Sequence, residues 1–194
     1  AYFQKWSQKQ GLTFAEKSFD HLLIKSGFQF SEIQKNLIFL QSYKADSNIT
    51  EEDIVQAIPK TLQDNIFDLT QLILAKKIDQ ARDLVKDLTL QGEDEIKLIA
   101  IMLGQFRLYT QVKILQESGQ TESQMVSSLG NYLGRNPNPY QIKFALRDTR
   151  GLSLNFLQDS IRYLIQADYQ IKTGVYEKGY LFERALLQIA SQSN

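Results

Sequence analysis

Residues that could carry out chemistry are few and widely spaced in this sequence. Cysteine is absent and His21 is the single histidine, so thiolate chemistry, disulfides, Cys-based zinc sites and a histidine-centred triad lack the residues they need. The sequence contains neither a P-loop nor a dinucleotide-binding glycine run, and the acidic residues 93–95 are interpreted as a helix start. We therefore predict no catalytic residue, no cofactor and no metal site.

The most informative polar residue is Asp168, because it stands within an apolar stripe. On a helix the stripe comprises Leu157, Ile161, Leu164, Asp168 and Ile171. Lys172 follows at the spacing that favours an ion pair, and Gly174 suits a left-handed helix end. Two interpretations stay open: a half-exposed salt bridge, or a buried polar staple that Glu183 or Arg184 joins.

A second group of residues belongs to a glycine- and asparagine-rich stretch. Residues 130–140 carry Tyr132, Arg135 and Tyr140, which are residue types favoured at protein interfaces. We favour a structural corner for this stretch, and the functional alternative is a contact loop between subunits. Arg107 follows a heavily apolar run, so it is a further candidate interface residue, with a plain surface arginine as the default.

The elements that must position these residues are all predicted to be helices, since alternating strand patterns are nearly absent. Residues 1–46 form a small three-helix domain in this prediction, in which Thr13 begins a helix with a capping-box pattern. A short polar linker follows. Residues 49–194 form a larger bundle of about six to seven helices, so the fold class is all-α.

Within the larger bundle, residues 93–117 are apolar on nearly every side and are predicted to be the central helix. A short helix is expected to end at Leu129, and a loop is expected to run from Gly130 to Asn138. Pro139 then opens the next helix, because proline is favoured in the first helical turn.

The composition is that of a globular protein, with eleven Phe, nine Tyr and a net charge of zero. A neutral chain is a poor electrostatic binder of nucleic acid, because contacts to phosphates need a surplus of Lys and Arg. No uninterrupted apolar stretch reaches the length of a membrane span, so we expect no membrane contact and a cytoplasmic location. The first residue is Ala1, and we expect the chain to be a fragment of a longer protein.

A set of short motifs occurs in a defined order along most of the chain. The motifs are residues 65–69, 81–84, 90–93 and 105–108, Leu133-Gly134 with Asn138-Pro139-Tyr140, Asp168 with Lys172-Thr173-Gly174, and Glu183. In this order and spacing, they resemble the delta subunit of the bacterial DNA polymerase III clamp loader. Asn138 stands where that family often has histidine.

This resemblance implies an arrangement of domains and partners. Residues 1–46 would be the helical lid of an AAA+-like fold (domain II), and residues 49–194 the collar domain (domain III) that assembles with the gamma/tau and delta-prime subunits. In the family, a preceding domain contacts the beta sliding clamp. The resemblance thus implies an indirect link to DNA and a non-catalytic part within a DNA-directed DNA polymerase, which is a nucleotidyltransferase.

Three alternatives remain at this point. The chain could be another clamp-loader subunit, namely delta-prime or gamma/tau. It could be an unrelated helical adaptor that binds a partner helix along the predicted hairpin of residues 62–91. An all-helical enzyme is disfavoured because the residues for catalysis are missing.

Overall fold

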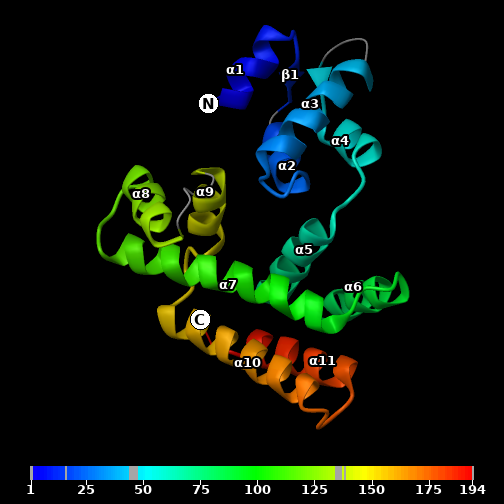
Figure 1. Ribbon diagram of the computed structural model, residues 1–194, viewed down its shortest axis with the longest axis vertical. Helices are drawn as coiled ribbons and strands as arrows, with labels where there is room; N and C mark the ends of the chain where they lie inside the picture. The colour runs from blue at the N-terminus through cyan, green and yellow to red at the C-terminus, as the bar shows by residue number, and fades with distance from the viewer. Residues whose placement is uncertain (1, 16, 44–47, 134–136, 138, 194) are drawn as a thin grey trace. The chain divides into compact units, whose positions relative to one another are not determined.

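The architecture is all-α, as predicted. The computed structural model describes residues 2–15, 17–43, 48–133, 137 and 139–193, and within them it contains eleven helices and one sheet of two strands, each two residues long (Figure 1). The chain forms two compact units, which comprise residues 1–64 and 65–194.

The N-terminal unit consists of four helices and the small parallel sheet. Its elements are α1 (Tyr2–Lys9), β1 (Thr13–Phe14), α2 (Ser18–Lys25), α3 (Phe30–Tyr43), β2 (Asn48–Ile49) and α4 (Glu51–Ala57). Helices α2, α3 and α4 pack against one another, and α1 packs on α3. Leu22, Leu23, Ile33, Leu37 and Leu40 are fully buried and form the centre of this unit.

The predicted helix start at Thr13 is wrong. Thr13 lies in β1, which pairs in parallel with β2, and Ala15 N donates to Ile49 O at 3.0 Å just beyond the paired residues. Helix α2 begins only at Ser18, after Lys17 in a left-handed conformation with φ +68°. Backbone pairing with a distant segment therefore overrides the local capping pattern at Thr13. A short stretch of sequence around Thr13 does not contain that segment, so it could not predict the pairing.

Residues 48–64 pack with the N-terminal unit. Ile49, Ile54 and Ile58 are buried there, and Lys25 extends from α2 to donate to Ile58 O and, at 3.5 Å, to Val55 O. The lysine thereby caps the carboxyl end of α4, where a cation also complements the helix dipole. These contacts group α4 with the first unit, although the sequence pattern predicted that the same residues belong to the second domain.

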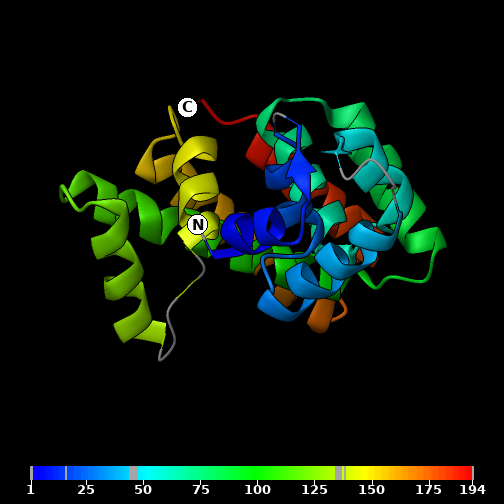
Figure 2. The same ribbon diagram turned by 90° about the horizontal axis from the view of Figure 1, so that it is seen from above.

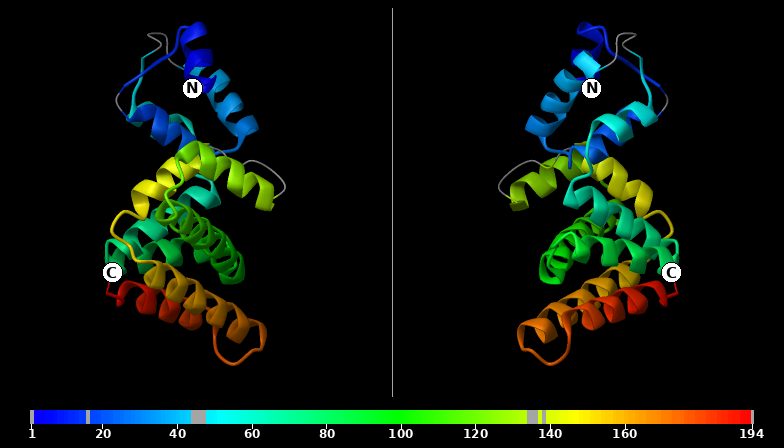
Figure 3. Two further views of the ribbon diagram at one scale, coloured as in Figure 1. Left: turned by 90° about the vertical axis from the view of Figure 1, so that its left-hand side faces the viewer. Right: turned by 90° about the vertical axis from the view of Figure 1, so that its right-hand side faces the viewer.

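The second unit contains seven helices. They are α5 (Leu62–Leu74), whose first three residues belong to the other unit, α6 (Ile78–Leu90), α7 (Glu95–Glu117), α8 (Glu122–Leu133), α9 (Pro139–Asp148), α10 (Leu154–Lys172) and α11 (Lys178–Ala190). Helix α7 is central: α8 and α9 pack against it and against each other (Figure 2), and α10 and α11 also pack against it. Figure 3 shows α10 and α11 running side by side and joined by a turn at one end.

Helix α7 is the one described helix whose length and composition would also suit a membrane span. Its inward side chains explain that composition. Leu98, Ile99, Met102, Phe106 and Val112 are fully buried, and neighbouring helices of the same unit cover them. A core helix with neighbours on several sides has the same apolar character as a spanning helix.

Helix α8 is longer than predicted, while α9 begins where expected. Helix α8 continues to Leu133 instead of ending at Leu129, so Gly130 lies inside the helix and not at the start of a loop. Pro139 is the first residue of α9. The glycine misled the prediction because glycine lowers helix propensity without preventing a helix.

The buried lysine of α2 gives a test of this packing. Lys25→Met leaves the carbonyl groups at the end of α4 without their donor, and we expect the free energy of unfolding to fall by about 1–3 kcal/mol. Urea unfolding followed by circular dichroism measures the change. Lys35→Met is the control, since the Lys35 side chain is 75% exposed and we expect a change within about 0.5 kcal/mol. Equal losses in both variants would contradict the capping role.

Candidate functional site

The structure offers no constellation for metal binding in the part of the chain that it describes. No three His, Cys, Asp or Glu side chains come together there. His21 Nδ1 lies 3.0 Å from Glu51 Oε1, at the first turn of α4. The candidate sites are therefore contacts that join helices and side chains that face outward.

Asp168 and Lys172 form an ion pair on α10. The Lys172 ammonium donates to Asp168 Oδ2 at 2.7 Å, and the Asp168 side chain is 24% exposed. Asp168 thus lies at the border of the stripe, beside the buried Leu164 and Ile171. A partly solvated ion pair at this helical spacing contributes only about 0.3–0.5 kcal/mol to the stability of the fold.

Gly174 ends α10 with a Schellman motif. Its φ is +68°, and the Val175 amide donates to Gln170 O at 3.2 Å while the Gly174 amide donates to Ile171 O at 3.1 Å. These two bonds satisfy carbonyl groups that the helix end leaves open. Gly174 therefore sets the turn from which α11 returns alongside α10.

Glu183 pairs with a helix other than α10. Arg82 Nε donates to Glu183 Oε1 at 2.5 Å and thereby connects α6 with α11. A second bridge to α11 joins Lys178 Nζ and Asp94 Oδ2 at 2.6 Å, and this hydrogen bond lowers the pKa of Asp94 and raises the pKa of Lys178. Among the described residues, Glu183 is thus brought to Arg82 and not to the ion pair of Asp168.

The predicted interface residues lie in different settings. Tyr132 is 77% exposed near the end of α8, Tyr140 is half-buried in the first turn of α9, and Arg107 is exposed on α7. Arg135 lies outside the described residues. The interface assignment of these four residues stays a prediction.

A buried polar network, which the sequence pattern did not reveal, joins three helices. Tyr109 OH of α7 donates to Asp148 Oδ2 of α9 at 2.8 Å and accepts from Gln105 Nε2 at 2.8 Å. Gln71 of α5 donates to the same carboxylate oxygen at 3.0 Å, and Thr70 Oγ1 lies 2.9 Å from Gln105 Oε1. The polar side chains of this network thus bond to one another where α5, α7 and α9 meet.

Burial gives this network its strength. The Asp148 side chain is only 3% exposed, and Arg147 Nε pairs with its other oxygen at 2.9 Å. Burial of Tyr109, together with the nearby negative charge of Asp148, raises the pKa of Tyr109 well above its usual value. The network is thus a set of mutually satisfied groups that hold α5, α7 and α9 in one register. In the sequence, the network is indicated only by the four-residue spacing of the polar residues Gln105 and Tyr109 on an apolar helix. That spacing does not predict which residues of other helices they contact.

The turn between α10 and α11 presents an aromatic tip, which we define as Tyr169, Val175, Tyr176 and Tyr180. Their exposed fractions are 66%, 53%, 60% and 54%. The rings of Tyr176 and Tyr180 lie 6.0 Å apart between centroids. Clusters of exposed aromatic side chains are typical of surfaces that bind other proteins, because aromatic rings bury a large area with few rotatable bonds.

The fold and these contacts define an all-helical scaffold with a rigid core and an outward aromatic surface. Comparison with known proteins then gives the family. The sequence profile described as the C-terminal domain of the DNA polymerase III delta subunit matches residues 63–189. The chain therefore belongs to the DNA polymerase III delta subunit family.

Two relatives from Bacillus subtilis support this assignment. The chain is 32% identical over 164 residues to DNA polymerase III subunit delta of strain 168, covering 84% of this chain and 45% of the relative. The solved structure of a DNA clamp loader delta protein matches with a TM-score of 0.78 and 29% identity, covering 96% of this chain and 53% of that one. The chain thus spans about half the length of these relatives.

The buried network generates one prediction. Tyr109→Phe leaves a buried carboxylate and an amide without their shared hydroxyl, so the free energy of unfolding should fall by about 1–3 kcal/mol at neutral pH. Because the folded-state pKa of Tyr109 is raised, its contribution is complete below about pH 10 and is lost as the pH rises through that folded-state pKa.

Tyrosinate absorbance provides the second measurement for this variant. Because burial raises the pKa of Tyr109, this phenol should resist ionisation in the folded protein, and Tyr109→Phe and the wild type should show the same absorbance change as the pH rises through the ordinary tyrosine pKa of about 10. Tyr132→Phe is the control for stability: the Tyr132 ring is 77% exposed, and we expect the free energy of unfolding to change by no more than about 0.5 kcal/mol. An absorbance change that is smaller in Tyr109→Phe than in the wild type would contradict burial of that phenol.

Two glycines provide a matched test of the α10 end. Gly174→Ala should destabilise the protein by about 1 kcal/mol because the left-handed conformation strains any Cβ. Gly104→Ala, in the exposed middle of α7, should stabilise it by roughly 0.5–1 kcal/mol through helix propensity. A Cβ at either position meets no atom within 4 Å, so backbone conformation alone separates the two variants. Thermal unfolding should therefore shift in opposite directions.

Proposed function

We propose that this chain is the part of a clamp-loader delta subunit that assembles with the gamma/tau and delta-prime subunits and supports loading of the beta sliding clamp in DNA replication. The observation that carries the proposal is the match of residues 63–189 to the C-terminal domain of the delta family. In this proposal the chain itself catalyses no reaction and works in the cytoplasm. Its contribution is to hold subunits together by burying helix surfaces.

The two parts of the chain have separate roles in this proposal. The sequence pattern assigned residues 1–46 to the lid of an AAA+-like fold and residues 49–194 to the collar; with α4 packed in the first unit, we propose residues 1–64 as the lid and residues 65–194 as the collar. Contact with the beta clamp belongs to a part of the family's longer chains that this chain does not span, since the relatives are about twice its length. The link to DNA is therefore indirect.

The aromatic tip supports an assembly role on physical grounds. Exposed tyrosines lose little conformational freedom on binding and bury a large apolar area. The tip stands on a helix pair that is tied to α6 and α7 by the Arg82–Glu183 and Lys178–Asp94 bridges. A rigid support lowers the entropy cost of association, which favours an interface at this end of the hairpin.

Purified gamma/tau and delta-prime subunits from the same source test the proposal directly. The chain should co-elute with them in size-exclusion chromatography. The double variant Tyr176→Ser with Tyr180→Ser should raise the dissociation constant about tenfold or more, because both rings lie in the proposed contact.

Tyr132→Ser is the matched comparison, since it removes another exposed tyrosine, from α8. A loss confined to this variant would move the interface to the end of α8. If the wild-type chain associates with neither subunit, the assembly role is refuted.

A further inference from the structure

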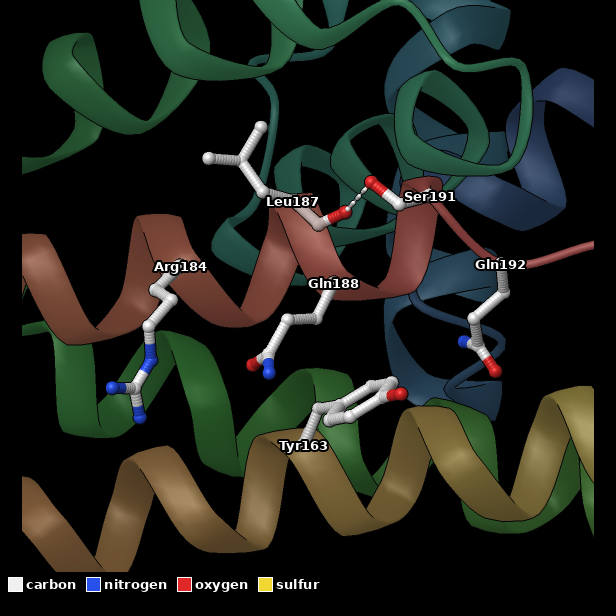
Figure 4. Close-up of a pocket in the computed structure, with 6 residues that line it drawn as sticks. All are labelled: Tyr163, Arg184, Leu187, Gln188, Ser191 and Gln192. Atoms are coloured by element: carbon white, nitrogen blue, oxygen red, sulfur yellow. Dashed lines mark hydrogen bonds between the residues drawn. The ribbon is translucent and has the colours of Figure 1, made fainter.

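A shallow hollow lies between α10 and α11, away from their buried seam. Its volume is about 370 Å³ and it is open to solvent. It is lined by Tyr163, Arg184, Leu187, Gln188, Ser191 and Gln192 (Figure 4). Arg184 and Gln188 extend from α11 toward α10, from which Tyr163 rises beside them. Every lining residue is uncharged except Arg184.

Arg184 differs from its neighbours in its charge balance. Arg82 meets Glu183 at 2.5 Å and Arg162 meets Asp159 at 3.0 Å. Arg184 instead donates from Nη2 to the neutral Gln170 Oε1 at 2.5 Å, and no described residue provides it with a carboxylate. Its Nε is buried without a hydrogen-bond partner. A half-buried guanidinium has lost part of its hydration, and a neutral amide replaces only some of it.

The geometry also leaves one edge of this cation available. Arg184 Nη2 is the atom that donates to Gln170, and Nη1 is not among the described buried atoms that lack a partner, so the Nη1 edge of the guanidinium is available toward the hollow that Arg184 lines. The Gln170 amide holds the group in place from the α10 side. An arginine that is positioned in advance and lacks a counter-ion is suited to accept a carboxylate from another molecule.

We propose that Arg184 receives an Asp or Glu side chain from a partner subunit that sits on the face formed by α10 and α11. This inference rests on the proposed function and deepens it by naming the anchor and the chemistry of its partner. Amide and hydroxyl groups of the hollow then hydrogen-bond around the ion pair, and Leu187 adds apolar contact. Exclusion of water by the partner strengthens the pair.

A protein carboxylate fits the hollow better than a nucleic-acid phosphate. Tracking a phosphate backbone requires several cations along a surface, whereas Arg184 is the one cation that lines this hollow. The whole chain also has no net positive charge. A single fork-shaped donor among neutral amides matches one planar carboxylate.

Arg184→Gln is the first test, with the full chain and immobilised gamma/tau and delta-prime subunits in surface plasmon resonance. The variant removes the charge and keeps a polar side chain, and we expect the dissociation constant to rise at least about tenfold. Arg162→Gln is the matched control, because its arginine lies on the same hairpin, is 73% exposed and already has a carboxylate partner. The control should bind within about twofold of the wild type.

Gln170→Glu provides a second test that does not depend on removing the arginine. The new carboxylate takes the place of the amide oxygen beside Arg184 and supplies the missing counter-ion from within the chain. We expect a melting temperature at or above that of the wild type together with a dissociation constant raised about tenfold. Higher stability with weaker binding is a combination that damage to the fold cannot produce.

The outcomes separate the two proposals. If the wild type binds neither subunit, the assembly function fails. If the wild type binds and both variants bind equally well, the assembly function stands and the role of Arg184 is overturned. Fluorescein-labelled primed DNA is tested in parallel: if Arg184→Gln loses DNA binding and retains subunit binding, the carboxylate assignment is wrong and a phosphate takes its place.

Discussion

The second unit depends on the burial of α7. Because Leu98, Met102 and Phe106 with their neighbours face inward around much of this helix, no single flanking helix can cover it, and partners must pack on more than one side. Helices α8 and α9 take one part of its surface and α10 and α11 another (Figure 1). The hairpin of α10 and α11, which carries the exposed surfaces, is held in place by this packing on α7.

Polar groups inside this packing determine its register. Apolar contacts alone tolerate sliding of one helix along another, whereas a buried hydroxyl or carboxylate has few positions in which its hydrogen bonds are satisfied. Tyr109 and Asp148 impose that condition between α7 and α9, and Gln71 extends it to α5. Replacing one member leaves its buried partners without a hydrogen bond, so each substitution in the network is expected to lower the stability of the fold.

The outward surfaces follow from the same arrangement. The stripe of α10 that contains Leu157 and Leu164 is buried against the unit, so the remaining faces of α10 and α11 are left for other contacts. The aromatic tip and the hollow with Arg184 both lie on this hairpin. The first provides apolar area and the second a single directed charge, a combination that gives an interface both affinity and orientation.

The sequence by itself determined the helices and most of their ends, since these depend on hydrogen bonds between residues a few positions apart. Thr50 forms a capping box with Asp53 at the start of α4, Pro139 opens α9, and Gly174 closes α10. Tertiary structure alone decided which residues meet across long separations. It drew Thr13 into a strand with Asn48 and Glu183 to Arg82, and it also assembled the network around Tyr109. Spacing within a helix is the same in every fold, but the partner of a buried or charged group depends on how whole helices pack, which local periodicity does not contain.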